Sequence, residues 1–96
     1  MVVSILVLIV ENAPPQLRGR LSLWLFEVRA GVFVGDCSAK LREWIWSCVR
    51  QNIRGGNALI IWSTSKKEFG FDVDSCGDSR RSICEIDGIK MMKFIS

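Results

Sequence analysis

The chain has 96 residues, a length that suits one domain and leaves no room for two. Hydrophobic residues make up 49% of it and charged residues 24%, a composition that argues against intrinsic disorder. The formal net charge is +3 and there is no histidine, which excludes histidine-based acid–base catalysis and histidine-ligated zinc.

An apolar, β-branched run at residues 5–10 predicts a strand covered on both faces. No basic segment precedes the run and no small-residue cleavage site follows it, so we do not expect a secretory signal. The run is also far shorter than the ~20 residues that span a bilayer. We therefore expect a cytoplasmic protein without a membrane partner, whose four cysteines stay reduced.

The next segment predicts an amphipathic helix over residues 14–29. Pro14 and Pro15 suit the first turn of a helix, where a missing N–H does no harm. Gly19 weakens the helix interior by roughly 1 kcal/mol relative to alanine, so we expect close packing or another backbone nearby. The apolar positions at helical spacing are Leu17, Leu21, Trp24, Leu25 and Val28.

A short strand at residues 32–35 leads into a second predicted helix. Asp36 or Ser38 can cap this helix, and Gly55-Gly56 ends it. One side of the helix is apolar and is expected to face the core. The apolar side consists of Leu41, Trp44, Ile45, Cys48 and Val49.

The tryptophans follow the helical pattern. Trp24 and Trp44 belong to the apolar sides of the two predicted helices and are assigned to the core. Trp46 falls outside that side of its helix, so we expect it to be partly exposed or to lie at a subunit contact.

The remainder of the chain predicts further strands. Residues 58–62 form a buried strand and residues 69–73 a strand of alternating character. The stretch 74–82 is predicted to be an exposed loop. After it, one or two short strands surround Asp87-Gly88, a favoured tight-turn pair.

This order of elements predicts a single α/β (α+β) domain over residues 1–96, with the helices on one face of a sheet. We expect a ferredoxin-like sandwich with a β-α-β-α-β core plus C-terminal strands. That plan also hosts small regulatory modules that bind ligands, so the fold alone does not assign a function.

Basic residues occur in local groups along the chain. Such groups fit either solvated faces or a surface that binds a polyanion. The groups are Arg18 with Arg20, Lys40 with Arg42, Lys66 with Lys67, and Arg80 with Arg81.

Several stretches, in order from about residue 7 to 95, resemble one family: the small CRISPR-associated adaptation protein conventionally called "Cas two", in its type I-E form. The stretches are ENAPPQLRGRL, WLFEVRAGVFVGD, SAKLREWIW, SRRS and DGIKMMKFI. The resemblance implies a ferredoxin-like fold and a symmetric homodimer that acts in spacer acquisition. It implies that the dimer bridges two dimers of an integrase, which performs the chemistry, and holds a duplex prespacer.

The resemblance also implies which residues contact DNA. A prespacer of unrestricted sequence must be held by its phosphates, for which the arginine fork is well suited, and this role needs no cofactor. Arg18 and Arg20 are about 200° apart on a helix and cannot share one face. Gln16 stands where relatives often carry arginine, which we expect to weaken the contacts. The implied DNA-binding residues are Arg18, Arg20, Lys40, Arg42, Arg80 and Arg81.

In this family the C-terminal strands pair with the integrase or complete the dimer sheet, a form of strand addition. The alternative is an edge strand of the same chain. The segment implied to make these contacts is 83–96, and its candidate partner-binding residues are Ile83, Ile86, Ile89, Met91 and Phe94.

A metal-dependent nuclease is the alternative function. Some relatives use an aspartate at the end of the first strand, where Mg²⁺ activates water against a phosphodiester. Here Glu11 and Asn12 occupy that position, which makes Glu11 the candidate metal ligand and the pair the candidate catalytic residues. The competing interpretation gives Glu11 a place near a helix N-terminus and makes Asn12 a helix cap.

Overall fold

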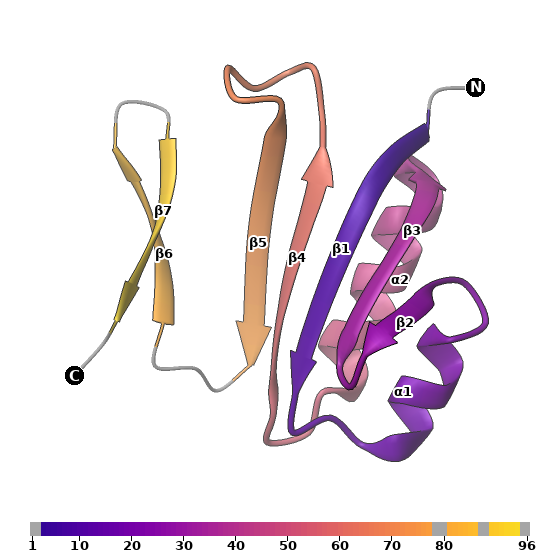
Figure 1. The fold of residues 1–96 in the computed structure, drawn as a ribbon. Coiled ribbons are helices and arrows are strands. Elements are labelled where there is room, and N and C mark those ends of the chain that lie inside the picture. Colours follow the sequence, from indigo (N-terminus) through magenta and orange to yellow (C-terminus); the bar gives the residue numbers. More distant parts are fainter. Residues whose placement is uncertain (1–2, 78–80, 87–88, 95–96) are drawn as a thin grey trace.

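The fold was obtained as a computed structural model that describes residues 3–77, 81–86 and 89–94, with side chains described over residues 4–77 (Figure 1). These residues form two helices and seven strands. In chain order they are β1 (Val3–Glu11), α1 (Pro15–Leu21), β2 (Phe26–Arg29), β3 (Val32–Ser38), α2 (Ala39–Asn52), β4 (Asn57–Ser63), β5 (Phe71–Gly77), β6 (Arg81–Ile86) and β7 (Ile89–Phe94).

Five strands form one antiparallel sheet in the order β2-β3-β1-β4-β5, and β6 pairs with β7 in a separate two-stranded sheet (Figure 1). The strand β1 lies at the centre and pairs with β3 on one side and β4 on the other. A β-α-β-β-α-β succession with this strand order is the ferredoxin-like arrangement. The predicted fold class is therefore confirmed.

The helices cover one face of the sheet, where the core lies. Along β1 Leu6, Leu8 and Val10 are buried, whereas Ile5 is exposed and Val7 and Ile9 are half-buried. The prediction that this strand is covered on both faces is wrong for the single chain, because only one face carries helices. The buried cluster includes Leu6, Leu8, Val10, Leu17, Leu21, Phe33, Ile45, Val49, Ala58 and Ile60.

The predicted helix over 14–29 is wrong in its second half, because α1 ends at Leu21 and β2 begins at Phe26. The strand β2 pairs with β3 through Phe26 opposite Val34 and then shifts register. The apolar positions after Leu21 fit a helix by spacing alone, but pairing with β3 supplies the backbone hydrogen bonds. The domain therefore contains one strand more than the β-α-β-α-β core predicted from the sequence.

The second helix matches its prediction closely. The Ser38 hydroxyl accepts a hydrogen bond from the Leu41 backbone N–H at 3.2 Å, so Ser38 and not Asp36 is the cap. Ile45, Cys48 and Val49 are buried on the predicted side. The helix ends at Asn52, shortly before the predicted Gly55-Gly56.

Two of the three tryptophan predictions agree with the structure. Trp24 is half-buried and packs against the core, and Trp46 is half-buried with its indole N–H donating to Asp74 Oδ2 at 3.1 Å. Trp44 is 61% exposed, so its assignment to the core is wrong. The buried side of α2 is narrow, and the 100° step from Ile45 to Trp44 is enough to leave it.

The predicted loop over 74–82 is also wrong. The strand β5 starts two residues after its predicted beginning at residue 69 and continues to Gly77, with Asp74 opposite Ile60. The strand β6 then begins at Arg81. The predicted turn at Asp87-Gly88 lies outside the described residues, but the strands on either side pair as a hairpin, with Ile86 opposite Ile89.

Neither described helix is long and apolar enough to cross a membrane. Among the residues with described side chains, Cys37, Cys48 and Cys76 are free thiols. Burial raises the pKa of the Cys37 thiol, and the neighbouring Asp36 raises it further.

Candidate nucleic-acid interface

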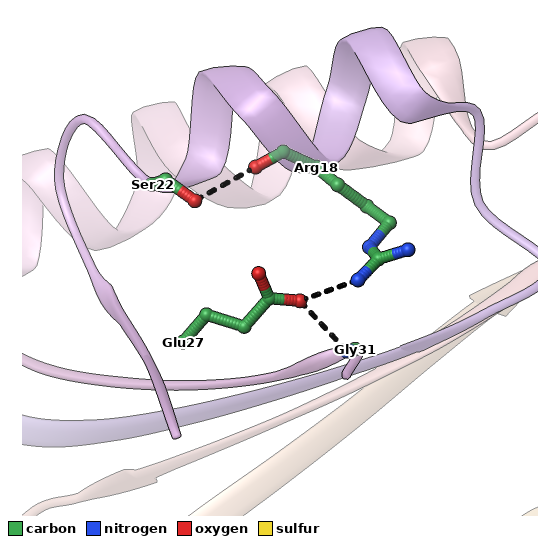
Figure 2. A network of polar contacts seen from close by, with 4 residues as sticks. All are labelled: Arg18, Ser22, Glu27 and Gly31. Atoms are coloured by element: carbon green, nitrogen blue, oxygen red, sulfur yellow. Dashed lines mark hydrogen bonds and ion pairs between the residues drawn. The ribbon is translucent and has the colours of Figure 1, made fainter. Parts of the chain in front are cut away.

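Arg18 forms an ion pair inside the protein (Figure 2). Its Nη2 atom lies 2.8 Å from Oε2 of Glu27, and the same carboxylate oxygen accepts the backbone N–H of Gly31 at 2.9 Å. This carboxylate therefore connects α1, β2 and the turn before β3. The hydrogen bond from Arg18, followed by the one from Gly31, lowers the pKa of Glu27 below its ordinary value.

The turn that Arg18 supports is tightly placed against β1. Gly31 has φ of +80°, and its carbonyl accepts the backbone N–H of Val10 at 2.8 Å. A Cβ atom at this position would lie 2.5 Å from the carbonyl oxygen of Val10, so only glycine fits. Arg18 is thus a positioning residue for this corner, with 41% of its side chain exposed.

Arg20 points to another part of the molecule, as the predicted divergence from Arg18 requires. Its Nη1 atom lies 3.5 Å from Sγ of Cys48 on α2. Arg20 also borders a cavity of about 410 Å³ between α1 and the end of α2. The lining residues of this cavity are Pro14, Gln16, Leu17, Arg20, Asn52 and Arg54.

Arg54 belongs to none of the basic groups predicted from the sequence. It lies two residues after the end of α2 and stands alone, without the neighbouring basic residue that marked the other groups. Gly19, in contrast, has no atom within 4 Å of a Cβ placed on it, so the expected close approach of another backbone is wrong.

Lys40 and Arg42 lie in the first turn of α2 and have different surroundings. Lys40 is exposed. Arg42 is half-buried, with its guanidinium carbon 4.5 Å from the centroid of the Trp62 ring on β4. This cation–π contact holds α2 against β4 and leaves only part of the guanidinium accessible.

The remaining predicted contact residues are in the C-terminal part of the chain. Arg80 lies outside the described residues. Arg81 begins β6, and its side chain lies outside the described part. The candidate partner-binding residues Ile83, Ile86, Ile89, Met91 and Phe94 are all located in β6 and β7, and their side chains are likewise outside the described part.

Glu11 and Asn12 lie at the end of β1. Glu11 is exposed and pairs in register with Asn57. Asn12 has φ of 56°, and its amide donates a long hydrogen bond of 3.5 Å to the Gly55 carbonyl. Asn12 is not a helix cap, because Pro14 occupies that position. Among the described residues, no group of three or more Cys, Asp and Glu could hold a metal ion.

The structure thus separates the predicted basic pairs. Arg18 and Arg20 diverge, and Arg42 stacks on Trp62 while Lys40 is exposed. It brings Arg20 together with Arg54, which is distant in sequence. The two helices carry five cations and one carboxylate between them. These are Arg18, Arg20, Lys40, Arg42 and Arg50, against Glu43.

One protein-family model, described as "CRISPR-associated protein (Cas_Cas2CT1978)", matches residues 5–91. The match covers all strands of the main sheet, both helices, β6 and the beginning of β7. It agrees with the family resemblance of the sequence motifs. The chain therefore belongs to this family of CRISPR-associated proteins, which supports a role in CRISPR adaptation.

Proposed function

We propose that the chain is a non-catalytic adaptor of spacer acquisition, of the type I-E form, which binds duplex prespacer DNA and bridges integrase dimers in the cytoplasm. The observation that carries this proposal is the charge of the helical layer. The two helices α1 and α2, which form this layer, carry five cations but only one carboxylate. Arg18 is the only one of these cations that forms an ion pair among the described residues. This role needs no metal ion or other cofactor.

A helical layer of this charge suits contacts with phosphates. Phosphate contacts carry no sequence information, which fits a ligand of unrestricted sequence. Each contact also releases counterions from the duplex, so binding weakens steeply as salt rises. Arg20, Lys40 and Arg50 are exposed and can reach a phosphate without breaking an internal ion pair.

The opposite face of the sheet supports the proposed homodimer. Val7 on β1 is opposite Val34 on β3 and also opposite Ile61 on β4. The three residues therefore lie side by side on neighbouring strands. All three are only half-buried, and Phe26 beside Val34 is 72% exposed. An apolar sheet face of this kind gains free energy by packing against a second copy. The helical layers of both copies then face outward.

The hairpin of β6 and β7 supports a contact with the integrase. It forms its own two-stranded sheet, apart from the five-stranded sheet (Figure 1). A two-stranded hairpin is marginally stable by itself in water, because it lacks a face on which to pack. Strand addition to another chain would supply that packing. We expect deletion of residues 83–96 to abolish co-purification with the integrase.

The adaptor role is tested by the salt dependence of DNA binding. The assembly with the integrase is prepared with Arg80→Ala plus Arg81→Ala, and its affinity for several duplex sequences is measured over a range of salt. We expect a similar loss of affinity for all sequences and a salt slope flattened by about 2. If the double variant kept the salt slope of the wild type, these two residues would not contact the DNA.

The matched control is Lys66→Ala plus Lys67→Ala. It removes an equal number of charges from the connection between β4 and β5, which belongs to neither helix nor to the hairpin of β6 and β7. We expect this variant to retain most of the affinity and the slope. An equal loss in both double variants would mean that net charge alone determines binding.

A further inference from the structure

The cavity between α1 and the end of α2 has the composition of an anion site. Two of its six lining residues are arginines, Arg20 and Arg54, and two carry amides, Gln16 and Asn52. None of the described residues that line it is acidic. Its volume of about 410 Å³ lies within the usual ~300–1,000 Å³ of ligand sites.

The two arginines come from separate elements and are not neutralised by an ion pair. Arg20 lies on α1 and Arg54 follows α2, and neither forms a salt bridge with any described residue. Two cations that line one cavity without a carboxylate repel each other, and an anion between them removes that repulsion. The arrangement thus favours an anionic ligand over an internal structural role.

Local contacts hold the walls of the cavity. The guanidinium of Arg20 approaches Sγ of Cys48 at 3.5 Å, which directs it toward α2. The Asn52 amide donates to the Cys48 carbonyl at 2.7 Å, and the Arg54 backbone N–H donates to the Asn52 carbonyl at 3.0 Å. Cys48 is buried, so the Arg20 guanidinium contacts a fixed point of the core, and the backbone of Arg54 is linked to the same point through Asn52.

We propose that this cavity binds one phosphate group of a nucleic-acid backbone between Arg20 and Arg54. The planar guanidinium groups supply N–H donors in the fork that suits phosphate oxygens, and Gln16 adds an uncharged amide donor at the same wall. This inference rests on the proposed DNA-binding function and adds Arg54 to it. A phosphate held here would fix the strand over the junction of the two helices.

The test is the Arg54→Gln variant of the full chain, with a mixed-sequence DNA duplex as the probe. We expect affinity to fall about 3–10-fold at low salt and the salt slope to fall by about 1, as for one lost phosphate contact. The matched control is Arg29→Gln. It removes the same charge from an exposed arginine at the end of β2, outside both helices, and Arg29 does not line the cavity.

A second variant keeps the test decisive if Arg54 also stabilises the helix end, where the dipole favours a cation. Gln16→Arg adds a third positive charge to the same cavity, and we expect it to tighten duplex binding and raise the salt slope by about 1. A helix-stabilising role would change the melting temperature of Arg54→Gln and leave the slope unaltered.

The outcomes separate this inference from the proposed function. Equal slopes for Arg54→Gln and Arg29→Gln, with no gain from Gln16→Arg, would overturn the cavity site. If Arg80→Ala plus Arg81→Ala still weakened binding, the adaptor function would stand without it. If no variant changed duplex binding, both would fail together.

Discussion

The guanidinium of Arg18 and the carboxylate of Glu27 meet at 2.8 Å, and this pair joins α1 to the edge strand β2 (Figure 2). The two residues are nine positions apart, in a segment whose apolar spacing predicts one continuous helix. The pair is the only ion pair among the described residues. A residue expected to contact DNA thus has a partner within the fold.

We expect Glu27→Gln to lower the melting temperature by a few degrees at neutral pH. The variant removes the charge that Arg18 and the Gly31 N–H stabilise, while it keeps the shape of the side chain. Thermal unfolding of Glu27→Gln, Arg18→Gln and the double variant forms a double-mutant cycle. Additive losses would show that the pair contributes no coupling.

The lowered pKa of Glu27 predicts a pH dependence of stability. Because the pKa of the folded state lies below that of the unfolded chain, the contribution is fully present above the ordinary glutamate pKa. It is lost as the pH falls through the lower folded value. We expect the stability of Glu27→Gln to fall less steeply with acidification over this window than that of the wild type. Parallel pH profiles would contradict this.

Gly31 and Gly19 are expected to respond to alanine in opposite directions. Gly31→Ala must adopt a left-handed backbone and place Cβ against the Val10 carbonyl, which we expect to cost about 2–4 kcal/mol. Gly19→Ala meets no atom within 4 Å and is expected to stabilise by up to about 1 kcal/mol. Denaturant unfolding at one protein concentration measures both. Equal destabilisation would contradict the backbone geometry.

The proposed dimer predicts a specific effect of charge on the open sheet face. Val34→Lys places an ammonium among Val7, Phe26 and the other apolar side chains of that face, and we expect it to weaken dimerisation at least ~10-fold. The control Gln51→Lys adds the same charge on an exposed position of α2. Sedimentation measurements decide the matter. An unchanged dimer in Val34→Lys would place the interface elsewhere.

Glu11 provides the test of the nuclease alternative. We expect Glu11→Gln and the wild type to show the same cleavage of RNA and DNA with Mg²⁺, because the adaptor role assigns no chemistry to this exposed carboxylate. Glu43→Gln, on α2, is the matched control. If the wild type and Glu43→Gln cleave nucleic acid and Glu11→Gln does not, the nuclease function is established.

Much of the fold was accessible from the sequence because it depends on short-range patterns. The apolar runs of β1 and β4 were assigned from neighbouring residues. Asp36 and Ser38 were the two candidate caps of α2, and the structure selects Ser38. The resemblance of the motifs gave the family, which the match over residues 5–91 confirmed. The predicted contacts of Arg80 and Arg81 remain predictions, as does the partner role of residues 83–96.

What the sequence determined by itself was the class of fold and the family, because periodicity, turn residues and motifs are local properties of the chain. Only the tertiary structure decided where α1 ends, since the apolar positions of 21–28 fit a helix by their spacing and pairing with β3 selects the strand. It also decided the roles of the arginines. Arg18 pairs with Glu27 across α1 and β2. Arg20 lines one cavity with Arg54, which lies 34 positions further along the chain, because α1 packs against α2.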